Sequence, residues 1–168
     1  MNYIIKFYIS LYSRNENTGI IRLNQYCNQV AMDKNIITKG KERALTSKEL
    51  QDLFLSVGWS SGHYPDKLEM AMRNYETVFT AWDGDKLVGL ISAMDDGIMT
   101  AYIHYLLVRP EYHGQGIGRQ LIEKIKFKYR DYLRIVLIAY DRECGFYEHC
   151  GFKKGMDETP MFITELWT

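Results

Sequence analysis

"VRPEYHGQGIGRQLIEKI", residues 108–125, places three alternating glycines directly ahead of an apolar pattern with helical spacing. Backbone N–H groups at the start of a helix have no partner within the helix, and the helix dipole adds positive potential there. Glycine allows a positive φ and leaves room for a ligand to lie against the backbone. The stretch therefore predicts a loop and helix start that hold an anion such as a diphosphate.

The spacing of the glycines separates several kinds of phosphate loop. A dinucleotide-binding fingerprint needs G-x-G-x-x-G, and its third glycine would fall on Arg119. A P-loop ends in Gly-Lys-Ser or Gly-Lys-Thr, and no such ending follows here. A loop whose glycines serve only a tight turn stays open on this stretch alone.

Length and composition indicate one globular domain. The chain has 168 residues, of which 46% are hydrophobic, and its 21 basic and 21 acidic residues give no net charge. That balance gives no electrostatic reason to expect nucleic acid as a partner. Three cysteines without a C-x-x-C pair predict neither a zinc site nor a disulfide framework, and they favour a reducing, cytoplasmic setting.

The N-terminal stretch, "MNYIIKFYISLYSR", is apolar but contains Lys6, and no small-residue cleavage site follows it. It is a poor signal peptide and too short to span a bilayer, so no membrane partner is expected. We expect residues 1–34 to be an extension packed on the domain as an extra strand or short helix. Residues 35–168 are expected to form the domain itself.

Turn signals and apolar periodicity predict an α+β order of elements. Thr46 and Glu49 have the spacing of a capping box, Pro65 suits a first helical position, and Asp83-Gly84 marks a hairpin turn. The near-continuous apolar run 134–140 predicts a strand buried on both faces. The expected helices are 46–57, 65–74, 117–130 and 143–151, and the expected strands are 35–40, 78–82, 87–94, 99–108, 134–140 and 160–167.

Two motifs together resemble one known family. "LLVRPEYHGQGIGRQLI" resembles the acyl-CoA-binding segment of the GNAT superfamily of N-acyltransferases, in which Gln/Arg-x-x-Gly-x-Gly/Ala follows a strand ending in Leu-x-Val. Gly116 and Gly118 fill the glycine positions, and His113 stands where Gln or Arg is usual. "FYEHCGF", residues 146–152, matches the family's Phe-Tyr-x-x-x-Gly-Phe.

The resemblance implies a fold and an activity. The fold would be a mixed, mostly antiparallel sheet with helices on both faces and a splayed central pair of strands. The activity would be transfer of an acetyl group from acetyl-CoA to a primary amine, by direct attack in a ternary complex. The alternative is a catalytically silent acyl-CoA-binding module with a regulatory role.

The same resemblance assigns the residues that hold acetyl-CoA. The diphosphate would lie on the backbone amides from Gln115 to Arg119, and the pantetheine arm would pair with the strand edge at residues 106–108. Asp141 lies near the position where the family usually has an Asn that contacts the arm. The expected coenzyme contacts are Leu106, Leu107, Val108, His113, Gly114, Gln115, Gly116, Ile117, Gly118, Arg119 and Asp141.

Two side chains are expected to move protons. Tyr147 occupies the position of the family's usual general acid, which protonates the leaving thiolate. His104 is the candidate base, because arylalkylamine N-acetyltransferases carry a histidine at the matching position and an imidazole pKa of ~6.5 suits proton transfer at neutral pH. Simple alternation places His104 on one face with Leu106 and Val108, whereas a β-bulge would present Tyr105 instead. A histidine with only a structural role in the sheet stays an alternative.

The acceptor side is the least defined part of the predicted site. In the family, the loop between the first two helices and the turn before the last strand line the acceptor cleft. The matching residues here, Trp59, His63, Tyr64 and Glu158, would form an aromatic and mildly acidic wall. Such a wall favours a small aryl- or polyamine over a peptide amine. No metal is expected, and a homodimer is an assembly that the sequence leaves open.

Overall fold

A computed structural model describes residues 36–39, 43–164 and 166 of the chain. The predicted N-terminal extension, residues 1–34, lies outside the described residues, so the division at residue 35 stays a prediction. No helix in the described part of the chain is long and apolar enough to cross a membrane.

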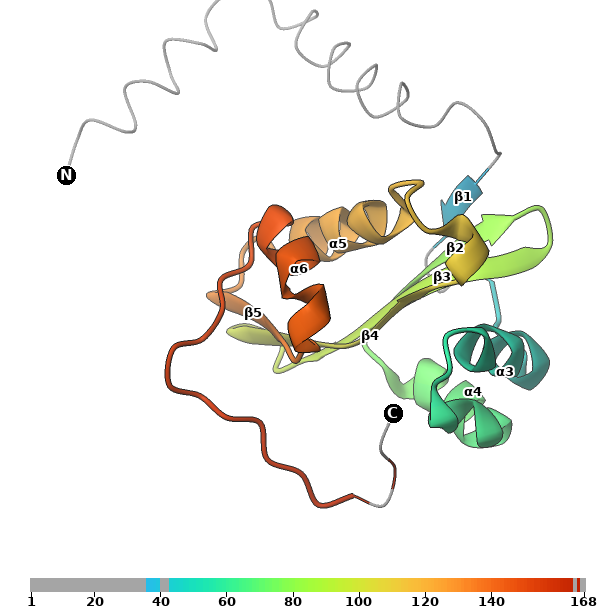
Figure 1. Cartoon of the computed structure of the whole chain (residues 1–168), viewed down its shortest axis with the longest axis horizontal. Helices are drawn as coiled ribbons and strands as arrows, with labels where there is room; N and C mark the ends of the chain where they lie inside the picture. Colours follow the sequence, from blue (N-terminus) through green and yellow to red (C-terminus); the bar gives the residue numbers. More distant parts are fainter. Residues whose placement is uncertain (1–35, 40–42, 165, 167–168) are drawn as a thin grey trace, which may run out of the picture. The chain divides into compact units, whose positions relative to one another are not determined.

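The centre of the described domain is a five-stranded sheet whose strand order follows the chain, β1-β2-β3-β4-β5 (Figure 1). The first four strands pair antiparallel, and β5 runs parallel to β4. The predicted hairpin is confirmed, because β2 and β3 meet around Asp83 and Lys86. The strands are β1 (Ile36–Lys39), β2 (Thr77–Asp83), β3 (Lys86–Asp95), β4 (Thr100–Val108) and β5 (Arg134–Leu137).

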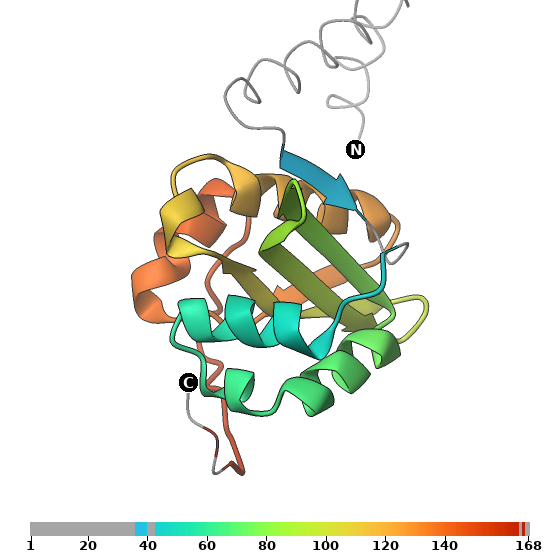
Figure 2. The same cartoon turned by 90° about the vertical axis from the view of Figure 1, so that its right-hand side faces the viewer.

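Helices cover both faces of this sheet (Figures 1 and 2). One core, which includes Leu50, Phe54 and Leu68, lies under α3 and α4, and the other, which includes Leu121 and Ile125, lies under α5. The apolar residues with helical spacing in the sequence therefore form the buried faces of these helices, as predicted. The helices are α3 (Ser47–Ser56), η1 (Ser60–His63), α4 (Pro65–Asn74), η2 (Pro110–Tyr112), α5 (Ile117–Lys128), η3 (Asp141–Glu143) and α6 (Cys144–His149).

A β-bulge in β4 sets which side chains face which helices. Ser92 pairs with Tyr105 and Ala93 pairs with Ile103, so His104 is the extra residue between them. Beyond the bulge, Tyr105 packs into the core under α3 and α4, while Leu106 packs under α5. The alternation that placed His104 with Leu106 and Val108 is therefore wrong, and the bulge is confirmed. The bulge does not present Tyr105 instead of His104, however, because the two rings stack on each other and both line the cavity.

The two parallel strands separate after a short pairing. β4 pairs with β5 from Thr100↔Arg134 to Ile103↔Leu137, whereas β4 itself continues to Val108. The last residues of β4 thus keep an edge that no described strand occupies on that side. This is the predicted splayed pair, and together with helices on both faces it confirms the predicted fold class.

Two expected strands differ from the structure. The strand expected at 134–140 ends at Leu137, and its residues alternate between exposed and half-buried positions. The expectation that this strand is buried on both faces is therefore wrong, because β5 is an edge strand of the sheet and one of its faces is exposed. The described part of the expected last strand, residues 160–164 and 166, forms no strand, and Met161 and Ile163 are almost fully exposed. Its β-prone composition favours a strand, but a strand also needs a partner edge, and that is a tertiary property.

Candidate active site

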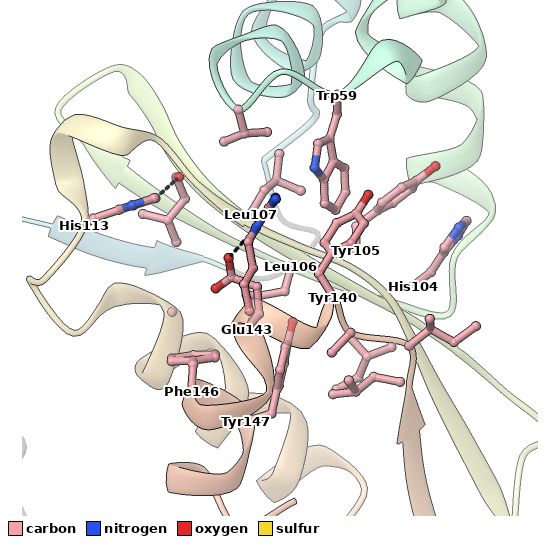
Figure 3. A pocket seen from close by; sticks show the side chains of 18 of the residues that line it. Trp59, His104, Tyr105, Leu106, Leu107, His113, Tyr140, Glu143, Phe146 and Tyr147 are labelled. Carbon is pink, nitrogen blue, oxygen red and sulfur yellow. Dashed lines mark hydrogen bonds and ion pairs between the residues drawn. The ribbon is translucent and has the colours of Figure 1, made fainter. Parts of the chain in front are cut away.

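A cavity of about 1080 Å³ lies where β4 and β5 separate. Its walls come from the end of β4, the start of α5, the turn after α3, and η3 with α6 (Figure 3). The splay creates the cavity because the strand edges from Leu106 to Val108 and after Leu137 no longer pair with each other. Segments from separate parts of the sequence, around residues 56–61, 102–119 and 137–147, therefore meet around one space.

The glycine loop, where the sequence predicts a cradle for an anion, lies at one end of this cavity. Gly114 and Gly116 have φ values of 75° and 76°, and Gly116 is the N-cap of α5. The first bond of the helix runs from Gln120 N to Gly116 O, so the amides of residues 117–119 have no carbonyl partner within the helix. This arrangement fits a diphosphate, because the free amides and the helix dipole act together.

Gly118 has a different role from the other two glycines. It lies inside α5, and a Cβ at this position would come within 3.3 Å of Cζ of Phe146. The missing side chain therefore lets α6 pack closely against α5. The sequence pattern suggested that all three glycines serve a ligand, whereas the third serves contact between helices.

His113 makes a contact that the sequence did not suggest. Its Nε2–H donates to the carbonyl of Val108, with 2.8 Å between the two atoms. The ring thus fixes the loop to the end of β4. His113 lines the cavity in this position, beside the strand edge and the cradle.

Tyr147 lies on α6, half-buried, at the gap between the strands (Figure 3). Its ring packs edge-on against Phe146 and Phe152. Burial raises the pKa of Tyr147 to about 12, and the charge of Glu143 adds to that effect. The phenol therefore keeps its proton throughout the neutral range.

An aromatic group forms the other end of the cavity. His104 stacks on Tyr105 with 4.0 Å between ring centroids and 17° between planes. Trp59 lies 5.7 Å from Tyr105 and 5.9 Å from Phe54, measured between centroids. Part of His104 stays open to solvent, yet the loss of water around its ring lowers the pKa of the imidazole. His104 is therefore mostly neutral at pH 7.

Charge is scarce around this cavity. Glu143 is the only carboxylate among the described residues that line it, and the Nε of Arg142 lies 3.2 Å from its Oε1. Arg119, at the cradle, also lines the cavity and suits a phosphate partner. The aromatic end contributes the imidazole of His104 to the lining.

Several residues that the sequence suggested lie outside this lining. Asp141 contacts Lys154 at 3.3 Å, and the Gln115 side chain reaches the Glu111 carbonyl at 3.4 Å. The other three are exposed: His63 at the end of η1, Tyr64 next to it, and Glu158 in the C-terminal segment. The remaining expected residues line the cavity: Trp59, His104, Leu106, Leu107, Val108, His113, Gly114, Gly116, Ile117, Gly118, Arg119 and Tyr147.

Tyr75 contacts a residue of the site, although the sequence gave no reason to expect this. It follows the last residue of α4, and its hydroxyl forms a hydrogen bond with Nδ1 of His104. The two residues are 29 positions apart and belong to no common motif. Only the tertiary fold brings them together.

Known proteins resemble this chain in sequence and in fold. A family profile described as an acetyltransferase (GNAT) domain matches residues 74–154. The ycf52 protein of Gracilaria tenuistipitata var. liui, titled an uncharacterized N-acetyltransferase, is 30% identical over 148 residues, covering 77% of this chain and 81% of that protein. GCN5-related N-acetyltransferase 2, chloroplastic, of Arabidopsis thaliana is 33% identical over 127 residues, covering 62% of this chain and 49% of its own length.

A solved structure agrees with these sequence relatives. A GNAT family acetyltransferase from Streptococcus pneumoniae TIGR4 superposes with a TM-score of 0.64 and 27% identity, covering 77% of this chain and 98% of that one. These likenesses identify the chain as an acyl-CoA-dependent acyltransferase, for which the cavity is the candidate active site. The chain belongs to the GNAT family of acetyltransferases.

Proposed function

We propose that this protein transfers an acetyl group from acetyl-CoA to the amine of a small aryl-containing acceptor, by direct attack in a ternary complex. One observation carries the proposal: a single cavity joins the amide cradle of α5, the Tyr147 hydroxyl and the aromatic group around His104. Both substrates then have a place on the same enzyme, one on each side of the splayed strands.

Acetyl-CoA would be held mainly by backbone. The amides at residues 117–119 would take the diphosphate, with Arg119 adding charge. The free edge of β4 at residues 106–108 would pair with the amides of the pantetheine arm, as an added strand does. The thioester supplies the electrophilic carbonyl carbon that the amine attacks.

Tyr147 would hold the proton that the departing sulfur needs. With a pKa raised to about 12, its hydroxyl stays protonated and donates a hydrogen bond toward the sulfur. General acid catalysis of this kind contributes about 10²–10⁴-fold in rate. The hydrogen bond from Tyr147 matters most while negative charge develops on the departing sulfur.

His104 would accept a proton from the amine, directly or through a water molecule. A free alkylammonium has a pKa of ~10.4, as for lysine, so at neutral pH the acceptor must lose a proton before it attacks. Burial lowers the pKa of His104, so the ring is already neutral when the acceptor arrives. A neutral imidazole beside the acceptor is the required state of a general base.

The lining favours an aryl group over a polyamine on the acceptor. Trp59 and Tyr105 offer ring faces and edges, which stabilise another aromatic ring by about 0.5–1.5 kcal/mol beyond area burial. A polyamine keeps further ammonium groups that need carboxylates, and Glu143, already paired with Arg142, is the one lining carboxylate of the described chain. The mildly acidic wall expected from Glu158 is not part of this lining.

The direct test is release of CoA thiol from acetyl-CoA over a panel of amines. The panel contains an arylethylamine, its saturated cyclohexyl analogue, a linear polyamine and a lysine peptide. We expect the highest kcat/KM for the arylethylamine and a lower value for the cyclohexyl analogue, which has similar size but no aromatic face. Binding of acetyl-CoA without release on any amine would instead support the silent binding module.

The role of His104 as the base has a separate test. His104→Ala should remove or shift the acidic limb of the pH profile of kcat/KM, and an unchanged limb would exclude His104 as the base.

The cytoplasmic location and the oligomeric state stay predictions, and the Arabidopsis relative carries "chloroplastic" in its name.

A further inference from the structure

A second arginine lines the cavity besides Arg119, and it has no part in the proposed proton transfers. Arg142 lies in η3, the turn between β5 and α6. Its side chain is 76% exposed, so it stands at the open side of the cavity. A positive charge in this place attracts an anionic ligand that enters the cavity.

Packing between two helices brings Arg142 to the same cavity as the amide cradle. η3 continues directly into α6, and Phe146 of α6 packs on Gly118 of α5, where a Cβ would come within 3.3 Å of Cζ of the ring. Gly118 belongs to the first turn of α5, and Phe146 follows Arg142 by about one helical turn. The cradle and Arg142 therefore border one space, the first from α5 and the second from η3.

Two neighbours hold the guanidinium of Arg142. Its Nε–H donates to Oε1 of Glu143, with 3.2 Å between the two atoms. Its central carbon lies 4.9 Å from the centroid of the Tyr140 ring, which faces it. Both neighbours also line the cavity, and Figure 3 shows Glu143 with this ion pair pointing into it.

This arrangement leaves the outer end of the guanidinium available to a ligand. Among the described residues, the hydrogen bond of Arg142 uses Nε, and none uses Nη1 or Nη2. The two Nη groups of an arginine form a planar fork that matches two oxygens of a phosphate. A fork that is already oriented loses less conformational freedom when it binds such a ligand.

We propose that Arg142 is a further coenzyme-binding residue, which Glu143 and Tyr140 orient so that its two Nη groups bind a phosphate of CoA. The phosphate is either the side of the diphosphate that faces away from the α5 amides or the 3′-phosphate of the adenosine. The inference rests on the proposed function in so far as the cavity binds acetyl-CoA.

Arg130 has the same local arrangement outside the cavity and supplies a matched control. Its Nε lies 3.6 Å from Oδ2 of Asp131, and its guanidinium carbon lies 4.6 Å from the ring centroid of Phe127. Arg130 is not part of the cavity lining. Arg130→Gln therefore removes the same charge, a similar ion pair and a similar ring contact without touching the proposed phosphate contact.

The test compares wild type, Arg142→Gln and Arg130→Gln for their affinity toward ligands that differ in their phosphates. Calorimetry measures CoA and dephospho-CoA, which lacks the 3′-phosphate, and an NMR titration measures the weaker S-acetylpantetheine, which has no phosphate. Arg142→Gln should raise the dissociation constant for CoA about tenfold, the low end for a hydrogen bond to a charged group, and leave that for S-acetylpantetheine unchanged. Arg130→Gln should bind all three ligands like wild type.

Dephospho-CoA identifies the phosphate that Arg142 binds. A loss that persists with dephospho-CoA assigns the contact to the diphosphate, whereas a loss confined to CoA assigns it to the 3′-phosphate. An equal loss for CoA and S-acetylpantetheine would overturn the inference, because Arg142 would then act on the pantetheine arm or on the fold. A loss with CoA no greater than that of Arg130→Gln would overturn it as well.

Two further variants test the orientation of the guanidinium. Arg142→Lys keeps the charge without the planar fork and should recover little of the lost affinity, so full recovery would refute the fork. Tyr140→Leu should weaken CoA binding in the wild-type background but not in Arg142→Gln, because its effect passes through Arg142. An equal effect in both backgrounds would refute the orienting role of Tyr140.

Failure of this inference is distinct from failure of the proposed function. If wild type binds CoA and Arg142→Gln binds it equally well, the inference fails and the coenzyme site stands. If wild type itself does not bind CoA, the coenzyme site fails and the inference fails with it. Because Arg142 is exposed, urea unfolding of its variants should match wild type, which excludes misfolding as the cause of a loss in affinity.

Discussion

Replacement of Gly116 by alanine tests the link between the glycine loop and the coenzyme. Gly116 has φ 76° and ψ 3° at the N-cap of α5, in the left-handed region. A residue with a Cβ costs about 1–2 kcal/mol there. The neighbouring Gly114 is exposed, so the loop of the free protein has room to relax toward negative φ. Relaxation would turn the amides of residues 117–119 away from the cradle.

The magnitude follows from that strain. In Gly116→Ala, binding of CoA must restore the left-handed conformation of residue 116, which costs about 1–2 kcal/mol of binding free energy. The dissociation constant for CoA should therefore rise about 5- to 30-fold. Isothermal calorimetry with CoA measures this rise, and urea unfolding measures stability. Gly116→Asn should lose less affinity, because asparagine tolerates this conformation better than alanine.

Gly84→Ala is the matched control. Gly84 has φ 57° in the hairpin turn between β2 and β3, a Cβ there would meet no atom within 4 Å, and the residue does not line the cavity. It should lose stability through the same strain but bind CoA like wild type. If Gly116→Ala also binds CoA like wild type, the reasoning that the cradle needs a left-handed residue at this position is refuted.

Three further predictions concern separate parts of the domain. Tyr147→Phe should lower kcat at least about tenfold with little change in acetyl-CoA affinity; unchanged turnover would remove Tyr147 from the mechanism. Trp59→Ala should raise KM for an arylethylamine far more than KM for acetyl-CoA, and equal effects would argue against an aryl subsite. Burial would raise the pKa of Asp95, but hydrogen bonds, including those from Tyr129 and Tyr132, hold it below its ordinary 3.8. Asp95 therefore contributes stability at neutral pH that is lost as pH falls through that depressed pKa, and in Asp95→Asn the unfolding free energy should fall less steeply in acid.

Local signals in the sequence were reliable. The capping box is confirmed, because Thr46 Oγ1 accepts from the amide of Glu49 while the Glu49 carboxylate accepts from the amide of Thr46. The glycine loop ends at the start of α5, and the hairpin turns at residues 83–86. Each of these features depends on residues within a few positions of one another, so a short window of sequence contains the whole physical cause.

Features that depend on pairing between distant segments were less accessible. A single extra residue at His104 reverses the faces of Leu106 and Val108, and an alternating apolar pattern reads the same with or without a bulge. Residue 118 is a glycine because the ring of Phe146 packs against it. A glycine pattern within one loop cannot reveal this contact with a distant helix. The contact of Tyr75 with His104 likewise joins α4 to β4.

The central claim is that backbone amides at the start of α5 hold the diphosphate of the coenzyme. Its most direct test is calorimetry on the folded full chain with acetyl-CoA and, in parallel, with S-acetylpantetheine, which has the same thioester and arm but no diphosphate. We predict clear binding heat with acetyl-CoA and much weaker binding of the shorter thioester. Equal affinity for the two, or no heat with acetyl-CoA, would contradict the claim.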